Sequence, residues 1–199
     1  MRDDSVTKLL LRVQAGEADA VDGLFGQVYD ELTALARRQR ARWHGNDTLN
    51  TTALVHEAYL KLIDQERIGV EGRAHFFALA ARAMRHILSN YARDQRRQKR
   101  GGSYAHVSVD DVQVAASAGE LTLTDGTADT LVALDEALAR LEAVSPRQSR
   151  VVECRFYGQM TVPETATALA ISPATVKRDW AVAQAWLHRE VQRELHRHE

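Results

Sequence analysis

Hydrophobic residues recur along most of this chain at spacings of three and four, the period of an amphipathic α-helix. In the first half of the chain, this pattern predicts helices over residues 5–13, 17–43, 51–63 and 72–100. In the second half, it predicts helices over residues 129–144, 147–157 and 161–170, and a last helix that begins at 173. The pattern therefore predicts an all-α fold.

The stretch 103–127 interrupts the helical period. It contains four acidic residues and no Lys or Arg, and it is rich in Ser, Thr, Gly and Ala. Such a composition buries little apolar surface and does not order itself. We interpret it as a flexible acidic linker between an N-terminal domain, 1–102, and a C-terminal domain, 128–199. The alternative is a pair of short strands formed by VSVDDVQV and LTLT.

The helix predicted over 72–100 separates apolar from basic residues. Its apolar side carries Phe76, Ala80, Ala83, Met84, Ile87 and Tyr91. Roughly opposite lie Arg82, Arg85, His86, Ser89, Arg93, Arg96, Arg97 and Arg100. Eight Lys or Arg stand against two acids between 71 and 100, a balance of +6. Because like charges at helical spacing repel, we expect a nucleic-acid phosphate backbone to neutralise this row. A solvated basic face is the alternative.

A second candidate for nucleic-acid binding follows near the C-terminus. Thr161 and Glu164 have the spacing of a capping box, and Ser172 with Pro173 predicts the start of the last helix. Two short helices joined by such a turn form a helix-turn-helix, whose second helix begins in the major groove. The inward residues are Val176, Trp180, Ala183 and Leu187, and those offered to DNA are Ser172, Ala174, Thr175, Lys177 and Arg178. The same corner also occurs as a plain packing unit.

Composition and motifs argue against several other classes. The net charge is −1, so affinity for nucleic acid has to come from the arrangement of charge. No apolar run approaches the roughly 20 residues that span a bilayer, and the start MRDDSVTKLL lacks the order of a secretion signal. Cys154 is the only cysteine, so we expect a cytoplasmic protein without disulfides, metal or cofactor. His56 and Glu57 begin a zinc motif that Leu60 fails to complete, and we predict no enzyme.

Three stretches together resemble the extracytoplasmic-function (ECF) group of bacterial RNA polymerase sigma factors. They are LVHEAYLKLI (54–63), GRAHFFALAARAMRHIL (72–88) and MTVPETATALAISPATVKRDWAVAQAWLHREV (160–191), in the order of the family and over nearly the whole chain. The resemblance implies an initiation factor whose partners are core RNA polymerase and promoter DNA, with an anti-sigma factor as a further candidate. Its N-terminal domain would bind the clamp of the β′ subunit and open the −10 element, and its C-terminal domain would read the −35 element as duplex.

The resemblance also implies roles for individual residues. Helix 51–63 is similar to the clamp-binding helix, so Leu54, Glu57 and Lys61 would contact polymerase. The loop 64–73 resembles the part that captures an unstacked base of the non-template strand. The residues that would line the −10 strand are Arg73, Arg82, Arg85, His86, Asn90, Arg93, Arg96 and Arg97. Those that would read the −35 duplex are the five helix-turn-helix residues named above.

The chain departs from the family at the start of the clamp-binding helix. Acidic residues usual in the family are replaced by Asn50, Thr51, Thr52 and Ala53. A phosphate on Thr51 or Thr52 would restore about −1.5 to −2 charges there. We therefore hypothesise that a Ser/Thr protein kinase licenses polymerase binding; the alternative is that both threonines are helix caps. Gly72 and His75 stand where the family tends to have aromatic residues.

Two other functions compete with the sigma-factor interpretation. A stand-alone helix-turn-helix regulator would bind duplex DNA without polymerase, but it would not need a second basic domain. A scaffold of helical domains would leave the arginine row of 72–100 unexplained. It would also lack the steep salt dependence that phosphate contacts produce.

Overall fold

The computed structural model describes residues 2–41, 50–64, 72–100, 114–117, 120–123 and 128–196. The first half contains α1 (Arg2–Gln14), α2 (Ala18–Ala41), α3 (Thr51–Asp64) and α4 (Arg73–Arg100). The second half contains α5 (Ala128–Val144), α6 (Pro146–Val152), the π-helical turn η2 (Glu153–Tyr157), α7 (Val162–Leu169) and α8 (Pro173–His196). The all-α fold class is confirmed, and the helices begin and end close to the predicted positions.

A short hairpin lies within the stretch interpreted as a linker. Strand β1 (Val114–Ser117) pairs antiparallel with β2 (Glu120–Leu123), with Val114 opposite Leu123. The alternative interpretation placed the second strand correctly, at LTLT, whereas β1 begins where the first predicted strand ended. The rest of 103–127 lies outside the described residues, as does most of the loop expected to capture a base.

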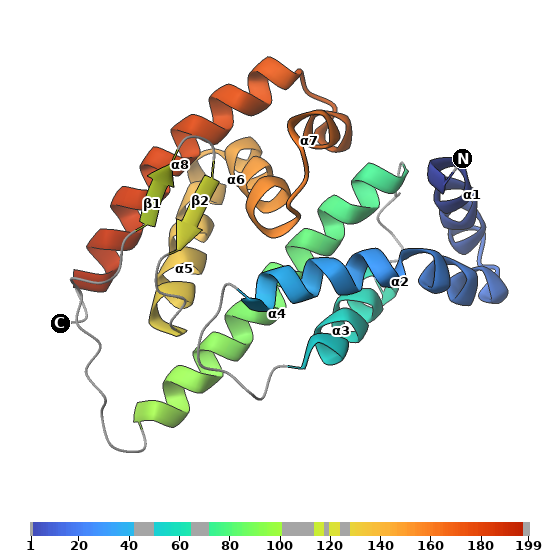
Figure 1. The fold of residues 1–199 in the computed structure, drawn as a ribbon, viewed down its shortest axis with the longest axis horizontal. Coiled ribbons are helices and arrows are strands. Elements are labelled where there is room, and N and C mark those ends of the chain that lie inside the picture. Colours follow the sequence, from blue (N-terminus) through green and yellow to red (C-terminus); the bar gives the residue numbers. More distant parts are fainter. Residues whose placement is uncertain are drawn as a thin grey trace.

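Helix α4 is the long central helix of the molecule (Figure 1). It packs against α3 from the first half and against α5, η2 and α7 from the second half. Most of the predicted apolar side is buried, including Phe76, Met84 and Ile87, and Tyr91 is half-buried. Ala81 and Leu88 are buried as well, because partners cover α4 on more than one side. One continuous hydrophobic core therefore includes residues from both halves of the chain.

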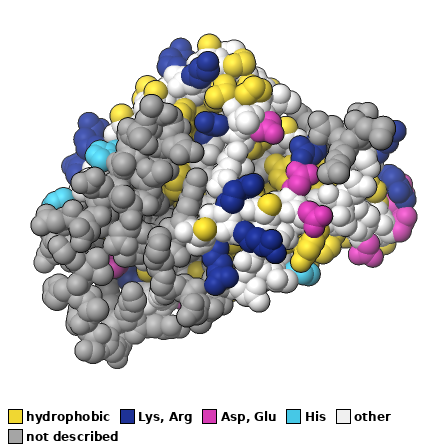
Figure 2. Space-filling model, viewed as in Figure 1, with side chains coloured by type: hydrophobic (Ala, Val, Ile, Leu, Met, Phe, Trp, Pro, Cys, Tyr) yellow, Lys and Arg dark blue, Asp and Glu magenta, His cyan; other side chains and the backbone are white. Residues whose placement is uncertain are grey.

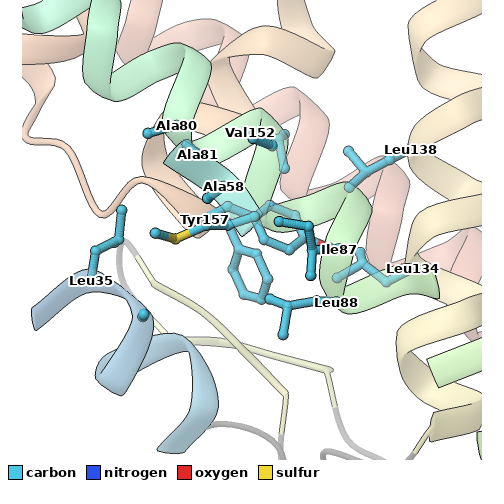
Figure 3. Close-up of a cluster of buried hydrophobic side chains, with 14 of the residues drawn as sticks. Leu35, Ala58, Ala80, Ala81, Ile87, Leu88, Leu134, Leu138, Val152 and Tyr157 are labelled. Atoms are coloured by element: carbon cyan, nitrogen blue, oxygen red, sulfur yellow. The ribbon is translucent and has the colours of Figure 1, made fainter. Parts of the chain in front are cut away.

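The turn η2 of the second half packs into the first half. Tyr157 is fully buried and lies in a cluster whose labelled side chains come from α2, α3, α4, α5 and α6 (Figure 3). The buried Gln39 of α2 donates hydrogen bonds from Nε2 to the carbonyl oxygens of Phe156, at 3.1 Å, and Tyr157. At Gly158 an added Cβ would lie 3.1 Å from the Cβ of Ala81 in α4. These contacts join the two halves into one packed body.

Candidate nucleic-acid interface

The corner between α7 and α8 is fixed by local hydrogen bonds. The predicted capping box is confirmed: Glu164 N donates to Thr161 Oγ1 at 3.3 Å, and Thr161 N donates to Glu164 Oε2 at 2.7 Å. The Thr161 hydroxyl, which donates to Glu164 Oε2 at 2.7 Å, and Thr161 N lower the pKa of Glu164, because both hydrogen bonds favour its carboxylate form. Helix α7 ends at Ala170, whose φ of 51° is left-handed. Ser172 Oγ then accepts from Thr175 N at 3.1 Å and caps α8. The sequence thus predicted both helix starts correctly.

The first turns of α8 present the predicted polar face to solvent. Four of the predicted residues are exposed: Ser172, Ala174, Lys177 and Arg178. Thr175 is half-buried, and its hydroxyl contacts Ser172 Oγ at 2.8 Å. The inward residues are buried as predicted: Val176, Trp180, Ala183 and Leu187. The Arg178 guanidinium approaches Asp179 at 3.7 Å but remains mostly exposed. The start of α8 is therefore free of any covering element among the described residues, and it carries two cations.

An ion pair anchors this end of α8 to the rest of the second half. Asp179 is buried, and Arg147 of α6 donates to it from Nε at 2.5 Å and from Nη2 at 3.3 Å. The hydrogen bond to Asp179 raises the pKa of Arg147. Because Asp179 follows Lys177 and Arg178 directly, this pair holds the turn of α8 that carries the two exposed cations against α6.

The basic row of α4 faces acidic residues of the second half. Arg82 Nη2 lies 2.9 Å from Glu142 Oε1, Arg93 Nη2 lies 2.5 Å from Asp135 Oδ2, and Arg96 Nε lies 3.1 Å from Asp129 Oδ1. All three acids belong to α5. Together with Arg85 and Glu153 of η2, described next, we call these residues the arginine clasp. The premise that the row lacks partners within the protein is therefore wrong.

Arg85 departs furthest from its predicted position. It was expected to face outward, but its exposed fraction is 2%, because α5 and η2 cover this side of α4. Its Nε donates to Asp135 Oδ1 at 2.9 Å, and its Nη1 donates to Glu153 Oε1 at 2.7 Å. Burial opposes its charge, yet Tyr157, Asp135 and Glu153 raise the pKa of Arg85. Burial raises the pKa of Glu153, although Arg85 opposes that shift.

The remaining residues predicted to line the −10 strand have varied surroundings. His86 and Asn90 are exposed on α4, and partial burial with nearby Arg85 lowers the pKa of His86. Arg97 is mostly exposed and pairs with Asp94 on the same helix at 3.5 Å. Arg73 pairs with Glu31 of α2 and lies over the Phe77 ring, 4.8 Å from its centroid. Figure 2 shows basic and acidic side chains together on the described part of one face.

Helix α3 presents a different face from the one expected. Leu54, predicted to contact polymerase, is fully buried, because α2 and α4 pack against this side of α3. Glu57 and Lys61 are half-buried, and Lys61 Nζ lies 4.0 Å from Glu57 Oε1. Among the α3 side chains that the structure describes, the exposed ones are Thr52, Ala53, His56 and Leu60. Leu60 has an exposed fraction of 60%, which is high for a large hydrophobic residue.

The first turn of α3 carries no acidic residue, as the sequence indicated. Asn50 Oδ1 accepts a hydrogen bond from Thr52 N at 2.9 Å, so Asn50 acts as the cap of this helix. Thr51 and Thr52 occupy the first helical positions, where Thr52 is exposed and Thr51 is half-buried. The alternative in which the two threonines are the caps is not supported by this geometry.

The acidic half of the arginine clasp was not predicted from the sequence. Its members are Asp129, Asp135, Glu142 and Glu153. For two of these acids, the sequence contained a signal that they would be buried. Asp135 follows the buried Leu134 within the apolar pattern of α5, and Glu153 stands between the buried Val152 and Cys154. An acid within a buried run needs a cationic or hydrogen-bonding partner, and the helix richest in arginine was the obvious source.

Other kinds of site find no support in the described part of the chain. It contains no group of three or more His, Cys, Asp or Glu side chains placed to hold a metal ion. None of its helices combines the length and apolar character needed to cross a membrane.

Comparison with known proteins supports one family. A family model described as "ECF sigma factor" matches residues 3–193, nearly the whole chain. A search of the curated proteins finds no match. The matched range includes both the clasp and the helix-turn-helix.

Proposed function

The chain belongs to the ECF sigma factor family, and we propose that its two halves carry different binding functions of that family. Sigma factors of this family bind core RNA polymerase and promoter DNA, often bind anti-sigma factors, and direct the initiation of transcription. In our proposal, residues 1–102 bind the clamp of the β′ subunit and the −10 strand. Residues 128–199 read the −35 element as duplex. The exposed, anchored start of α8 is the observation that carries this proposal.

The side chains at the start of α8 suit contact with duplex DNA. Ala174 is small, so the backbone can approach the base edges of the major groove. Arg178 is exposed, and its planar guanidinium can donate two hydrogen bonds to the O6 and N7 atoms of guanine. Lys177 is exposed beside it and is suited to a phosphate. We propose Arg178 as the base-reading residue and Lys177 as the phosphate contact.

This assignment predicts that two substitutions weaken DNA binding by the holoenzyme in different ways. Arg178→Ala should weaken binding to the preferred −35 duplex by about 1–3 kcal/mol and relax specificity at one base pair. Lys177→Ala should weaken binding to all sequences similarly and reduce the salt dependence by about one counterion. Binding is measured against duplex promoter fragments over a range of KCl concentrations. Arg189→Ala, exposed later on α8, and Lys8→Ala, exposed on α1, are the matched controls. Equal losses of DNA affinity in the controls and in the two variants would contradict the assignment.

We further propose that α3 binds polymerase through Thr52, His56 and Leu60. These residues lie at intervals of four, so they form one exposed stripe along the helix. Leu60 supplies an apolar contact, and Glu57 and Lys61 flank it. Leu54 supports the helix from the core side instead of touching the partner.

The finer proposal is that phosphorylation of Thr51 or Thr52 by a Ser/Thr kinase licenses this contact. The first turn of α3 has no acid, and a helix N-terminus favours negative charge. A phosphate would add about −1.5 to −2 charges at this end. Thr52 is the better candidate, because it is exposed whereas Thr51 is half-buried.

A pull-down with core RNA polymerase tests both levels of this proposal. The chain is assayed before and after treatment with a candidate kinase, beside the variants Thr52→Glu and Thr52→Val. We expect Thr52→Glu and the phosphorylated chain to bind at least about tenfold more tightly than the untreated chain. Thr52→Val, which removes the hydroxyl and adds no charge, should bind like the untreated chain. If Thr52→Glu binds no better than Thr52→Val, the phosphorylation switch is wrong. Tight binding to duplex DNA without polymerase binding in any state would instead support a stand-alone regulator.

A further inference from the structure

We propose that the acids of the arginine clasp replace the promoter strand on α4 while the chain is free, so that the factor inhibits its own −10 binding. This inference rests on the proposed role of α4. The residues expected to line the −10 strand include Arg82, Arg85, Arg93 and Arg96. Each of them is paired with a carboxylate of the second half. A strand has to compete with these carboxylates at the partly exposed Arg82 and Arg93, and it cannot reach Arg85 at all in the closed structure.

The pairs of the clasp form an ordered ladder. Arg82 of α4 meets Glu142, the later Arg93 meets Asp135, and Arg96 meets Asp129, the earliest of the three acids on α5. The order therefore reverses, as expected for two antiparallel helices. Asp135 and Glu142 are seven residues apart, close to two helical turns, so they share one face of α5. Asp129 is six residues before Asp135 and lies about 120° around the helix, exposed in the first turn of α5, from where it still reaches Arg96. Helix α5 thus places three carboxylates along the arginine row of α4.

The outer and inner parts of the clasp differ in how readily they open. The pairs of Arg82 and Arg96 reach the surface: the side chains of Arg82, Glu142 and Asp129 are substantially exposed, and such pairs contribute little to stability. Arg85 is instead sealed between Asp135 and Glu153 and becomes available only when α5 and η2 leave α4. Outer pairs can therefore exchange for phosphates, whereas full use of the row requires separation of the two halves.

Separation also exposes apolar surface. Tyr157 and Ala81 would lose their partners across the interface, and Gln39 would lose its two carbonyl acceptors. A partner that covers these surfaces is therefore needed to hold the halves apart. Core RNA polymerase, the partner of this family, is the candidate in our proposal. Free chain would remain closed, and polymerase would open it.

The inhibition is selective for one of the two DNA contacts. The start of α8 is exposed in the same closed structure, so the duplex-reading face is not blocked. Free chain should consequently bind single-stranded DNA poorly while its helix-turn-helix remains accessible. Duplex binding through Lys177 and Arg178 serves as an internal reference for every variant.

The test uses charge-neutralising changes in the outer clasp. The double variant Asp129→Asn, Glu142→Gln removes two exposed pairs with α4. The control Asp30→Asn, Glu136→Gln changes the net charge equally, at residues for which the described part of the chain shows no ion pair with α4. All substituted side chains are at least partly exposed, and circular dichroism is used to check that each variant folds. Fluorescence anisotropy then measures binding to a labelled mixed-sequence single strand of about 20 nucleotides.

We expect the clasp variant, without polymerase, to bind the single strand about tenfold more tightly than wild type, and the control to match wild type. With saturating core polymerase, all three chains should open promoter DNA equally. Equal single-strand affinity of the clasp variant and wild type, in chains that open promoters with polymerase, would overturn the self-inhibition alone. If none of the chains opens promoters or binds single strands with polymerase present, the proposed role of α4 fails, and the inference fails with it.

Discussion

Replacing Arg85 with alanine is expected to lower the free energy of unfolding by about 3–5 kcal/mol. The substitution leaves Asp135 and Glu153 buried without the cation that contacts both of them. Breaking a buried ion pair from one side is costly because the remaining charge cannot be solvated. Burial already raises the pKa of Glu153, and loss of Arg85 removes the main opposing effect. The decrease in the free energy of unfolding should therefore depend on pH.

The direction of this pH dependence follows from linkage. A carboxyl whose pKa is higher in the folded than in the unfolded chain stabilises the fold below its unfolded pKa, and this contribution is lost as pH rises through the folded pKa. In Arg85→Ala, the pKa of Glu153 should rise further above its ordinary value. We therefore expect the deficit relative to wild type to be smaller in mildly acidic buffer than at pH 8.

Guanidinium unfolding of the intact chain, followed by circular dichroism at both pH values, measures this effect. Arg97→Ala is the matched control, because Arg97 has an 81% exposed side chain and pairs only with an exposed Asp94 among the described residues. That change should alter stability by no more than about 0.5 kcal/mol. Arg85→Met should cost less than Arg85→Ala, since an apolar chain fills the space. Equal effects at positions 85 and 97 would mean that the clasp centre does not stabilise the fold.

Local patterns predicted the helices and their starts well, because the physics that sets them is local. The capping box of Thr161 and Glu164 and the cap at Ser172 each involve residues within three positions of one another. The inward face of α8 was likewise readable from spacing, and Val176 and Leu187 are fully buried. The exposed start of the candidate recognition helix could therefore be predicted from sequence alone.

The partner of the basic row could not be read in the same way. A helical projection shows which residues share a face, but not what covers that face. Arg85 meets Asp135 fifty positions later, across the boundary that was interpreted as a flexible linker. A basic face that binds phosphate and a basic face that binds acidic side chains have the same sequence pattern. The burial of Leu54 could not be read from the sequence for a related reason, because a role carried over from a family does not say which side of α3 is packed.

These corrections change what the arginine row means for function without removing it from the DNA-binding proposal. A helix that must bind a phosphate backbone is left with uncompensated positive charge when the DNA is absent. Here α5 and η2 supply that compensation within the chain. The same residues can then serve the closed fold and the promoter complex in turn, provided that a partner separates the halves.

Cys154 allows the closed state to be followed without adding a probe. It is the only cysteine of the chain, its exposed fraction is 1%, and it lies in η2, the turn that supplies Glu153 to the clasp. Burial raises the pKa of Cys154 from 9.0 to about 12, with the Glu153 charge adding to the effect. Because the thiolate is the reactive form, its fraction at pH 8 is about a thousandfold lower than at the ordinary pKa.

We therefore expect Cys154 to react with a disulfide reagent at pH 8 at least about a thousandfold more slowly in the native chain than in guanidinium. Burial of the sulfur adds steric protection, so the native rate should report opening of η2 rather than direct attack. A Cys154→Ser, Ala181→Cys chain, with its thiol at an exposed position of α8, should react rapidly without denaturant. If opening of the clasp releases η2, Arg85→Ala should speed the reaction of Cys154 under native conditions, whereas Arg97→Ala should not. A native rate equal to the denatured one would show that η2 is not held closed.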